Sequence, residues 1–185
     1  QAAEESFRTY IHPYDDPAVI AGQGSVAKEI VDELGDYLAT VVIPVGGGGL
    51  VAGMAAWLKE NRPDVRIVGV EAAGAASVHA SLRAGHPVSL ETIDAFVDGT
   101  AVREAGAATH SIVRDLVDEI VVIPEGAVCT EMLDLYHLDG IIAEPAGALA
   151  TAAISLAAAG LLPELVLDGP TVAILSGGNN DLSRY

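Results

Sequence analysis

Cysteine and long apolar runs are scarce in this sequence. A single cysteine, Cys129, occurs among 185 residues, which excludes a disulfide within the chain and favours a reducing compartment such as the cytoplasm. No apolar run reaches the length of a membrane span and no signal peptide is recognisable, so we expect no membrane association. Apolar residues nonetheless make up 51% of the chain, which is enough for a sizeable core.

Basic residues are the second scarcity. The chain has nine lysines and arginines against 26 acidic residues, a net charge of −17, which argues against nucleic acids and anionic membrane surfaces as partners. An anionic ligand would have to be held by backbone dipoles instead. The first residue is Gln1 and the first methionine is Met54, so we expect this sequence to be a piece of a longer polypeptide.

Glycine, by contrast, is concentrated in one place. Four consecutive glycines, Gly46–Gly49, follow the apolar run Thr40–Val45, which is typical of a buried strand, and precede a helical stretch over 50–60. A strand, a glycine loop and a helix N-terminus together can cradle a phosphate through backbone N–H groups. The loop matches neither the Walker A motif nor the dinucleotide fingerprint. The alternative is a tight turn with no ligand.

The remaining pattern alternates strands with helices and predicts an α/β fold. We expect a mostly parallel sheet covered by helices on both faces, with residues 1–185 as a single domain. Residues 1–24 are predicted to be loop. Further helices are predicted at 25–34, 77–83, 110–116, 125–138 and 144–159, and further strands at 66–71, 119–123 and 171–175.

Two of these strands end in glycine-rich turns. Val45 leads into the tetraglycine loop, and Leu175 leads into Ser176-Gly177-Gly178-Asn179. Ligands of open parallel sheets bind at the carboxyl ends of strands. If the two strands are neighbours, a phosphate cradle and a hydroxyl lie at one rim, which suits a flat ligand with a phosphate at one end.

These segments carry a family resemblance. The sequence is similar to the fold-type II pyridoxal-phosphate enzymes, and most of all to the biosynthetic threonine dehydratases (threonine deaminases), over nearly its whole length. The matching segments, in chain order, are Ala21–Ser25, Gly46–Leu50, Asp98–Val102, Gly140–Ala148 and Ser176–Asn179. The tetraglycine loop together with the Ser-Gly-Gly-Asn turn is the specific pair among them.

The resemblance implies roles for matched positions. The cofactor phosphate would be bound by the backbone N–H groups of Gly46, Gly47, Gly48, Gly49 and Leu50. Ser176 would meet the pyridine nitrogen, where a hydroxyl, unlike a carboxylate, does not force protonation and so favours β-elimination over transamination. Gly99, Glu144 and Gly177 are further candidates beside the cofactor. The alternatives are a plain turn serine at Ser176 and a first-turn helix acid at Glu144.

The resemblance also implies a cation site in some relatives. Glu71, Ala75 and Ser77 occupy the matching positions, but a serine stands where an acid is expected, so a monovalent cation fits better than a divalent one. The alternative is a strand-end acid at Glu71 and a helix cap at Ser77. The five histidines show no metal-ligand spacing, and we expect them on the surface or in loops.

The sequence departs from the family in its lysines. A pyridoxal-phosphate enzyme needs a lysine to hold the cofactor and move the Cα proton, but this chain has only Lys28 and Lys59, each in a helical segment. The catalytic-lysine segment is therefore expected outside this chain. We interpret the sequence as the C-terminal portion of a catalytic region, inactive alone, that stops before any regulatory domain.

The implied parent enzyme converts L-threonine to 2-oxobutanoate and ammonia with pyridoxal 5′-phosphate, in the cytoplasm and in isoleucine biosynthesis. Its partner is a small amino-acid substrate, and we expect a homo-oligomer for the full-length enzyme. A serine dehydratase or racemase of the same family remains open. So does a non-catalytic α/β module that binds a phosphate ligand.

Overall fold

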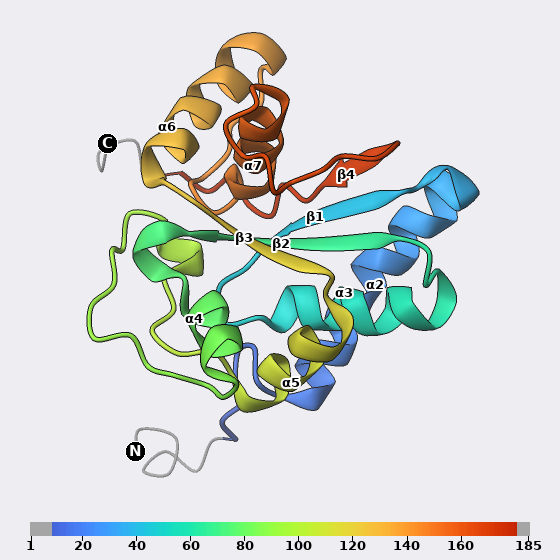
Figure 1. Ribbon diagram of the computed structural model, residues 1–185, viewed down its shortest axis with the longest axis vertical. Coiled ribbons are helices and arrows are strands. Elements are labelled where there is room, and N and C mark those ends of the chain that lie inside the picture. The colour runs from blue at the N-terminus through green and yellow to red at the C-terminus, as the bar shows by residue number, and fades with distance from the viewer. Residues whose placement is uncertain (1–8, 181–185) are drawn as a thin grey trace.

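A four-stranded parallel sheet forms the centre of the computed structural model, which describes residues 9–180 (Figure 1). The spatial order is β3-β2-β1-β4, and each neighbouring pair is parallel. The strands are β1 (Thr40–Pro44), β2 (Arg66–Ala72), β3 (Glu119–Ile123) and β4 (Thr171–Ala173). Because β1 lies between β2 and β4, the two glycine-rich turns predicted to share a rim do follow neighbouring strands.

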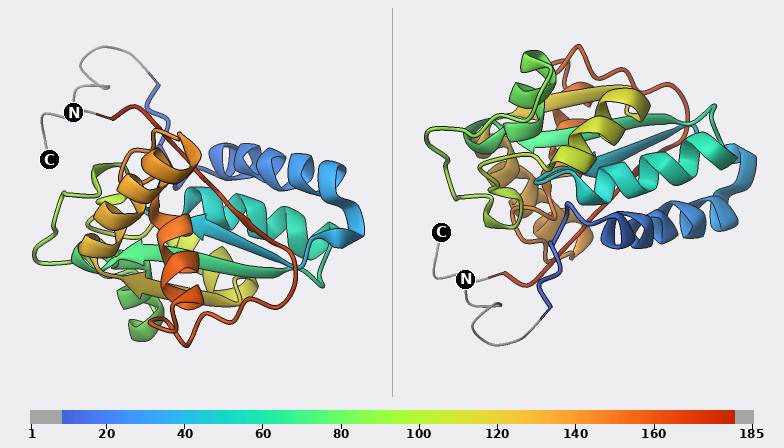
Figure 2. Two further views of the ribbon diagram at one scale, coloured as in Figure 1. Left: turned by 90° about the horizontal axis from the view of Figure 1, so that it is seen from above. Right: turned by 90° about the horizontal axis from the view of Figure 1, so that it is seen from below.

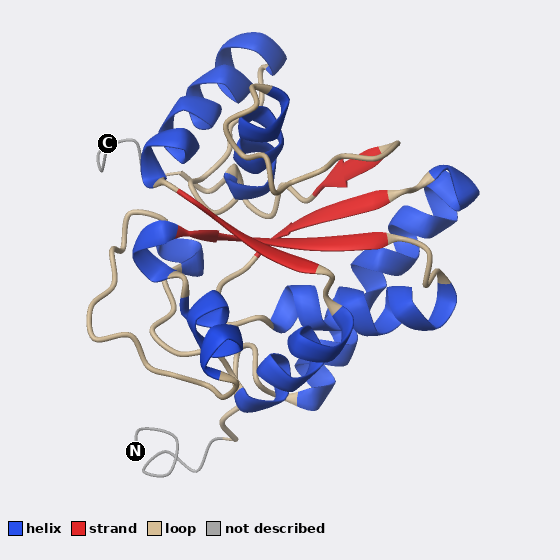
Figure 3. Cartoon of the chain, in the orientation of Figure 1, coloured by secondary structure: helices blue, strands red, loops and turns tan. Residues whose placement is uncertain are grey.

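Helices cover both faces of this sheet, as predicted (Figures 1 and 3). Helices α6 and α7 lie on one face, and α2, α3, α4 and α5 lie on the other, as the views from above and below also show (Figure 2). The helices are α2 (Pro17–Leu34), α3 (Gly49–Asn61), α4 (Ser77–Ala84), α5 (Ala107–Leu116), α6 (Glu125–Asp134) and α7 (Leu149–Ala158). No helix within the described residues is long and apolar enough to span a bilayer.

The central strand shows why both faces are covered. Side chains alternate along a strand, so Val41 and Ile43 pack with residues of α2, α3 and α5, while Val42 packs with residues of α6 and α7. All three are fully buried. Burying a side chain of this size contributes roughly 1.5–3 kcal/mol, so the apolar run of β1 stabilises both helix layers.

The prediction that residues up to 24 form a loop was wrong from Pro17 onward, because α2 begins there. Asp16 caps the helix by accepting hydrogen bonds from the N–H groups of Ala18 (2.8 Å) and Val19 (3.2 Å). The prediction missed the cap because of two glycines inside the helix. One of them, Gly24, faces Gly53 of α3, and a Cβ there would lie 3.1 Å from the Gly53 carbonyl oxygen. These small residues let α2 and α3 approach closely.

Strand β4 ends at Ala173 rather than at Leu175, and three other helix boundaries differ from the sequence prediction by more than one residue. Helix α5 begins at Ala107 rather than His110, and His110 is buried instead of exposed. Helix α6 ends at Asp134 and continues as a π-helical turn over Leu135–Asp139. Helix α7 begins at Leu149, because the preceding segment is tied to the last turn of the sheet by contacts described below. The short 3₁₀ turns are Gly35–Tyr37, Ala73–Ala75 and Asp98–Thr100.

Candidate functional site

A cavity of about 370 Å³ lies where the glycine loop after β1 meets the turn after β4. Its wall comes from five separate stretches of the chain, and it contains most of the residues singled out from the sequence. The lining residues are Pro13, Tyr14, Pro44, Gly46, Gly47, Gly48, Gly49, Leu50, Gly99, Thr100, Val102, Glu144, Ala146 and Ser176. No lysine or arginine is among them.

The glycine loop has no room for side chains. A Cβ at Gly46 would lie 3.0 Å from the Thr100 Cα, and one at Gly47 would lie 2.3 Å from the ring of Tyr14. Gly48 has a φ of +91° and forms the N-cap of α3 without a side-chain hydrogen bond. The first N–H groups of a helix have no acceptor within it. The loop therefore presents backbone donors and the positive end of the α3 dipole to the cavity.

A buried threonine holds this loop in place. The Thr109 hydroxyl donates hydrogen bonds to the carbonyl oxygens of Gly47 (2.7 Å) and Gly106 (3.1 Å), and its side chain is fully buried. A Cβ at Gly48 would lie 3.0 Å from the Cβ of Thr109. Thr109 was not among the residues singled out from the sequence, since nothing local marks it as a partner of a loop 62 residues away.

Ser176 and Glu144 line the same cavity as the loop. The Ser176 hydroxyl is 3.4 Å from the Ala146 carbonyl oxygen, at the long end of a hydrogen bond, which leaves it open to a stronger partner. The Glu144 N–H donates to the Gly177 carbonyl oxygen at 3.1 Å. A Cβ at Gly177 would lie 2.2 Å from the Glu144 carboxylate, so this glycine makes room for that side chain.

The structure thus brings together all but one of the predicted cofactor-binding positions. The exception is Gly177, which does not line the cavity but leaves room for the Glu144 carboxylate. Glu144 does not occupy the first turn of α7, because that helix begins five residues later. Sequence reasoning missed Tyr14 and Thr100 as wall residues. The signal for Thr100 lay in the Asp98–Val102 stretch, of which only Gly99 was selected.

The candidate cation residues cluster at the end of β2. Glu71 is fully buried and accepts hydrogen bonds from the N–H groups of Val78 (2.9 Å) and His79 (2.7 Å). Burial raises the pKa of Glu71 to about 7, against the opposing effect of these two hydrogen bonds. The Ser77 hydroxyl is buried with no hydrogen-bond partner among the described residues, and Ala75 lies beside it in the preceding turn.

The structure corrects the alternative that Ser77 caps a helix, and leaves open the alternative that Glu71 is only an acid at the end of a strand. Ser77 is the first residue of α4 and not its cap, because Glu71 caps that helix from β2. No group of three or more histidine, cysteine or acidic side chains suited to a metal ion exists within residues 9–180. A cation here would have to be held by one carboxylate, a hydroxyl and backbone oxygens, which are ligands for a hard cation.

Neither lysine reaches the cavity. Lys59 lies near the far end of α3, where its Nζ is 2.9 Å from the carboxylate of Asp118 and 3.2 Å from the Val65 carbonyl oxygen. Lys28 pairs with Asp32 one turn along α2 on the surface. Both ammonium groups are thus engaged away from the glycine loop.

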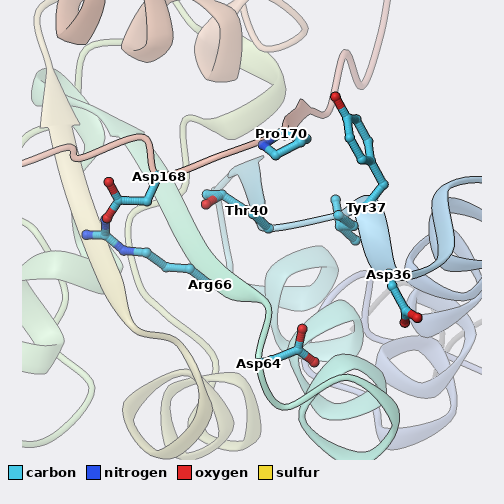
Figure 4. A pocket seen from close by; sticks show the side chains of 9 residues that line it. Asp36, Tyr37, Thr40, Asp64, Arg66, Asp168 and Pro170 are labelled. Atoms are coloured by element: carbon cyan, nitrogen blue, oxygen red, sulfur yellow. The ribbon is translucent and has the colours of Figure 1, made fainter.

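Two further hollows lack the features of the glycine-loop cavity. One of about 540 Å³ lies at the amino ends of the strands and is shown in Figure 4. Arg66 in this hollow donates hydrogen bonds to the Val166 carbonyl oxygen and to the Glu119 carboxylate, so its guanidinium is already engaged. The other, of about 560 Å³, runs along α6 and is lined mainly by apolar side chains such as Met132 and Tyr136.

Comparisons with known proteins agree with this geometry. The pyridoxal-phosphate dependent enzyme family matches residues 1–177. The chain is 44% identical over 184 residues to a biosynthetic L-threonine dehydratase of Bacillus subtilis. The alignment covers 100% of this chain and 42% of that protein. Among solved structures, threonine deaminase isoform 2 of Solanum lycopersicum superposes with a TM-score of 0.89 at 39% identity, over 99% of this chain and 52% of that one. Maize serine racemase superposes with a TM-score of 0.86 at 31% identity, over 98% of this chain and 55% of that one. The chain therefore spans about half the length of the relatives it matches.

Proposed function

The chain belongs to the pyridoxal-phosphate dependent enzyme family, and we propose that it forms the phosphate-binding portion of the catalytic region of a threonine ammonia-lyase. The reaction is the conversion of L-threonine to 2-oxobutanoate and ammonia, with isoleucine biosynthesis as its role. The observation that carries the proposal is a single cavity that joins the glycine loop at the N-terminus of α3 to the hydroxyl of Ser176.

The residues present fit the cofactor. When bound, pyridoxal phosphate supplies an electron sink beside the Cα of an amino acid. Gly46 to Gly49 and Leu50 would hold its phosphate through backbone N–H groups, because no cationic side chain within residues 9–180 lines the cavity and each glycine stands where a Cβ would meet Thr100, Tyr14 or Thr109. The dipole of α3 adds to that attraction.

Ser176 and Glu144 would lie at the ring end of the cofactor. The Ser176 hydroxyl would hydrogen-bond to the pyridine nitrogen and, being neutral, leave that nitrogen unprotonated, which suits elimination. Glu144 lines the same cavity beside Gly99, where an added Cβ would lie 3.5 Å from the Glu144 carboxylate and 2.8 Å from the Ala146 Cβ. The chain would thus bind the cofactor at both ends, while the lysine that moves the proton lies outside residues 1–185.

The proposal is tested in the protein expressed from its complete gene. We expect a visible cofactor absorbance and production of 2-oxobutanoate and ammonia from L-threonine. A serine dehydratase would instead prefer L-serine and release pyruvate, and a racemase would yield D-serine, an alternative that the likeness to maize serine racemase supports. A protein with neither absorbance nor turnover would be a non-catalytic phosphate-binding module.

Ser176→Ala tests the ring end of the site. The variant should fold normally but lose one hydrogen bond to the cofactor, which costs about 1 kcal/mol and weakens cofactor affinity by about fivefold. Titration of cofactor absorbance and the elimination rate should both show the loss. Ser155→Ala, at an exposed position of α7, is the matched control and should change neither. Equal values for Ser176→Ala and wild type would remove Ser176 from the site.

A cation at Glu71 is a separate proposal, supported by the buried carboxylate and the unpartnered hydroxyl of Ser77. Replacing potassium chloride with tetramethylammonium chloride at constant ionic strength should lower the melting temperature, because tetramethylammonium is too large for the site. Ser77→Ala should reduce that difference. A melting temperature that is the same in both salts would leave Glu71 with its helix-capping role alone.

We also propose that residues 1–185 form one α/β domain of a cytoplasmic homo-oligomer that binds neither nucleic acid nor membrane. The net charge of −17 supports the absence of nucleic-acid and membrane partners, and the single cysteine supports the cytoplasm. Sedimentation of the complete protein tests the oligomer.

A further inference from the structure

The N-terminus of α5 is capped by a residue from a distant part of the chain. The Asp15 carboxylate accepts hydrogen bonds from the N–H groups of Ala107 (3.0 Å), Ala108 (2.8 Å) and Thr109 (3.2 Å). The local N-cap residue, Gly106, has no side chain to do this, and a Cβ there would lie 2.2 Å from the Asp15 carboxylate. Gly106 thus makes room for a cap that comes from 92 residues away.

The capped turn is also the one that holds the glycine loop. Thr109, whose N–H is bound by Asp15, donates its hydroxyl hydrogen bond to the Gly47 carbonyl oxygen at 2.7 Å. The Gly106 N–H approaches the same oxygen at 3.5 Å. A continuous series of hydrogen bonds therefore runs from the Asp15 carboxylate through the first turn of α5 to the loop that lines the cavity.

Two residues just before Asp15 support the loop and the cap: Tyr14 packs against the loop, and His12 binds the Asp15 backbone. The ring of Tyr14 covers Gly47, and its hydroxyl donates to the Glu104 carbonyl oxygen at 3.1 Å. The His12 Nδ1 accepts the Asp15 N–H at 2.9 Å, and the His12 ring meets the Tyr14 ring edge-on at 4.5 Å. This bracing keeps the Asp15 carboxylate aimed at α5.

We propose that Asp15 is a positioning residue for the phosphate cradle. By capping α5 it fixes Thr109, which fixes the Gly47 carbonyl, and with that carbonyl turned toward α5 the neighbouring N–H groups stay available to the ligand. Without the cap, the Gly47 peptide is free to rotate and present its oxygen to an anion. The inference rests on the proposed function and adds to it a residue outside the cavity wall.

The neighbouring residue provides a matched control. Asp16 also caps a helix, through the N–H groups of Ala18 and Val19 in α2, but neither of these hydrogen bonds involves the glycine loop or α5. Asp15→Ala and Asp16→Ala each remove one helix cap, and both should lower the melting temperature. Only Asp15→Ala should weaken binding of pyridoxal 5′-phosphate to the apo form of the complete protein, by about tenfold, which corresponds to the loss of one such cap.

The readout is the dissociation constant from absorbance titration, together with protection against thermal unfolding by inorganic phosphate alone. Thr109→Val should weaken both to a similar extent, and Thr109→Ser, which keeps the hydroxyl, should restore them. Since Asp15 acts through Thr109, the Asp15→Ala/Thr109→Val double variant should be less impaired than the product of the single effects.

Two results would overturn the inference. One is equal affinity in Asp15→Ala and Asp16→Ala; the other is a double variant in which the single effects multiply. Failure of the proposed function differs from both, because the wild-type protein itself would then bind pyridoxal phosphate no better than pyridoxal or would not turn over threonine.

Discussion

Gly48→Asp is expected to abolish binding of pyridoxal phosphate by the protein expressed from its complete gene. Gly48 has a φ of +91°, which costs about 1–2 kcal/mol for a residue with a side chain, and its added Cβ would press on Thr109 at 3.0 Å. The carboxylate would also repel the phosphate by about 4 kcal/mol at a separation of about 4 Å and an effective dielectric of about 20. The repulsion alone corresponds to a loss of roughly 1000-fold in affinity.

The control is Gly85→Asp. Gly85 has a similar φ of +77° after α4, but nothing lies within 4 Å of its added Cβ. This variant carries the same backbone strain and the same added charge without touching the loop, so cofactor titration should match wild type. Normal cofactor binding by Gly48→Asp would mean that the four glycines only form a turn.

Borohydride reduction of the cofactor-loaded protein should attach the cofactor to a lysine outside residues 1–185. Lys59 is held by Asp118 and the Val65 carbonyl at the far end of α3, and Lys28 is paired on the surface with Asp32. Neither lines the cavity. Peptide mass mapping identifies the labelled residue, and a single label per active site is expected.

Lys28→Arg and Lys59→Arg keep the charge and both ion pairs, so each variant should retain wild-type turnover of L-threonine. The variant of the externally labelled lysine should instead lose turnover completely, because no other group then links the cofactor covalently or moves the Cα proton. Stoichiometric label on Lys28 or Lys59, with loss of turnover in that arginine variant, would place the catalytic lysine within this chain.

The strand, glycine loop and helix around Gly46–Gly49 could be predicted from sequence because their signals are local. A β-branched run makes a buried strand, four glycines allow close backbone approach, and an alanine- and leucine-rich stretch continues as helix. The same local logic placed β3 at its observed bounds and predicted the C-terminal ends of α2 and α4 to within one residue. Together with the Ser176 turn, these signals identified the two ends of the candidate site.

Only the tertiary structure decided which residues cap a helix or hold a loop that lies far away in the sequence. Asp15 caps α5, Glu71 caps α4 and Thr109 holds the glycine loop, each across a gap in sequence that no local pattern reports. Gly177 makes room for Glu144 in the same way. Helix propensity and hydrophobic periodicity depend only on residues close together in the sequence. The unsatisfied N–H groups at a helix end, in contrast, bind any acceptor that the fold brings to them.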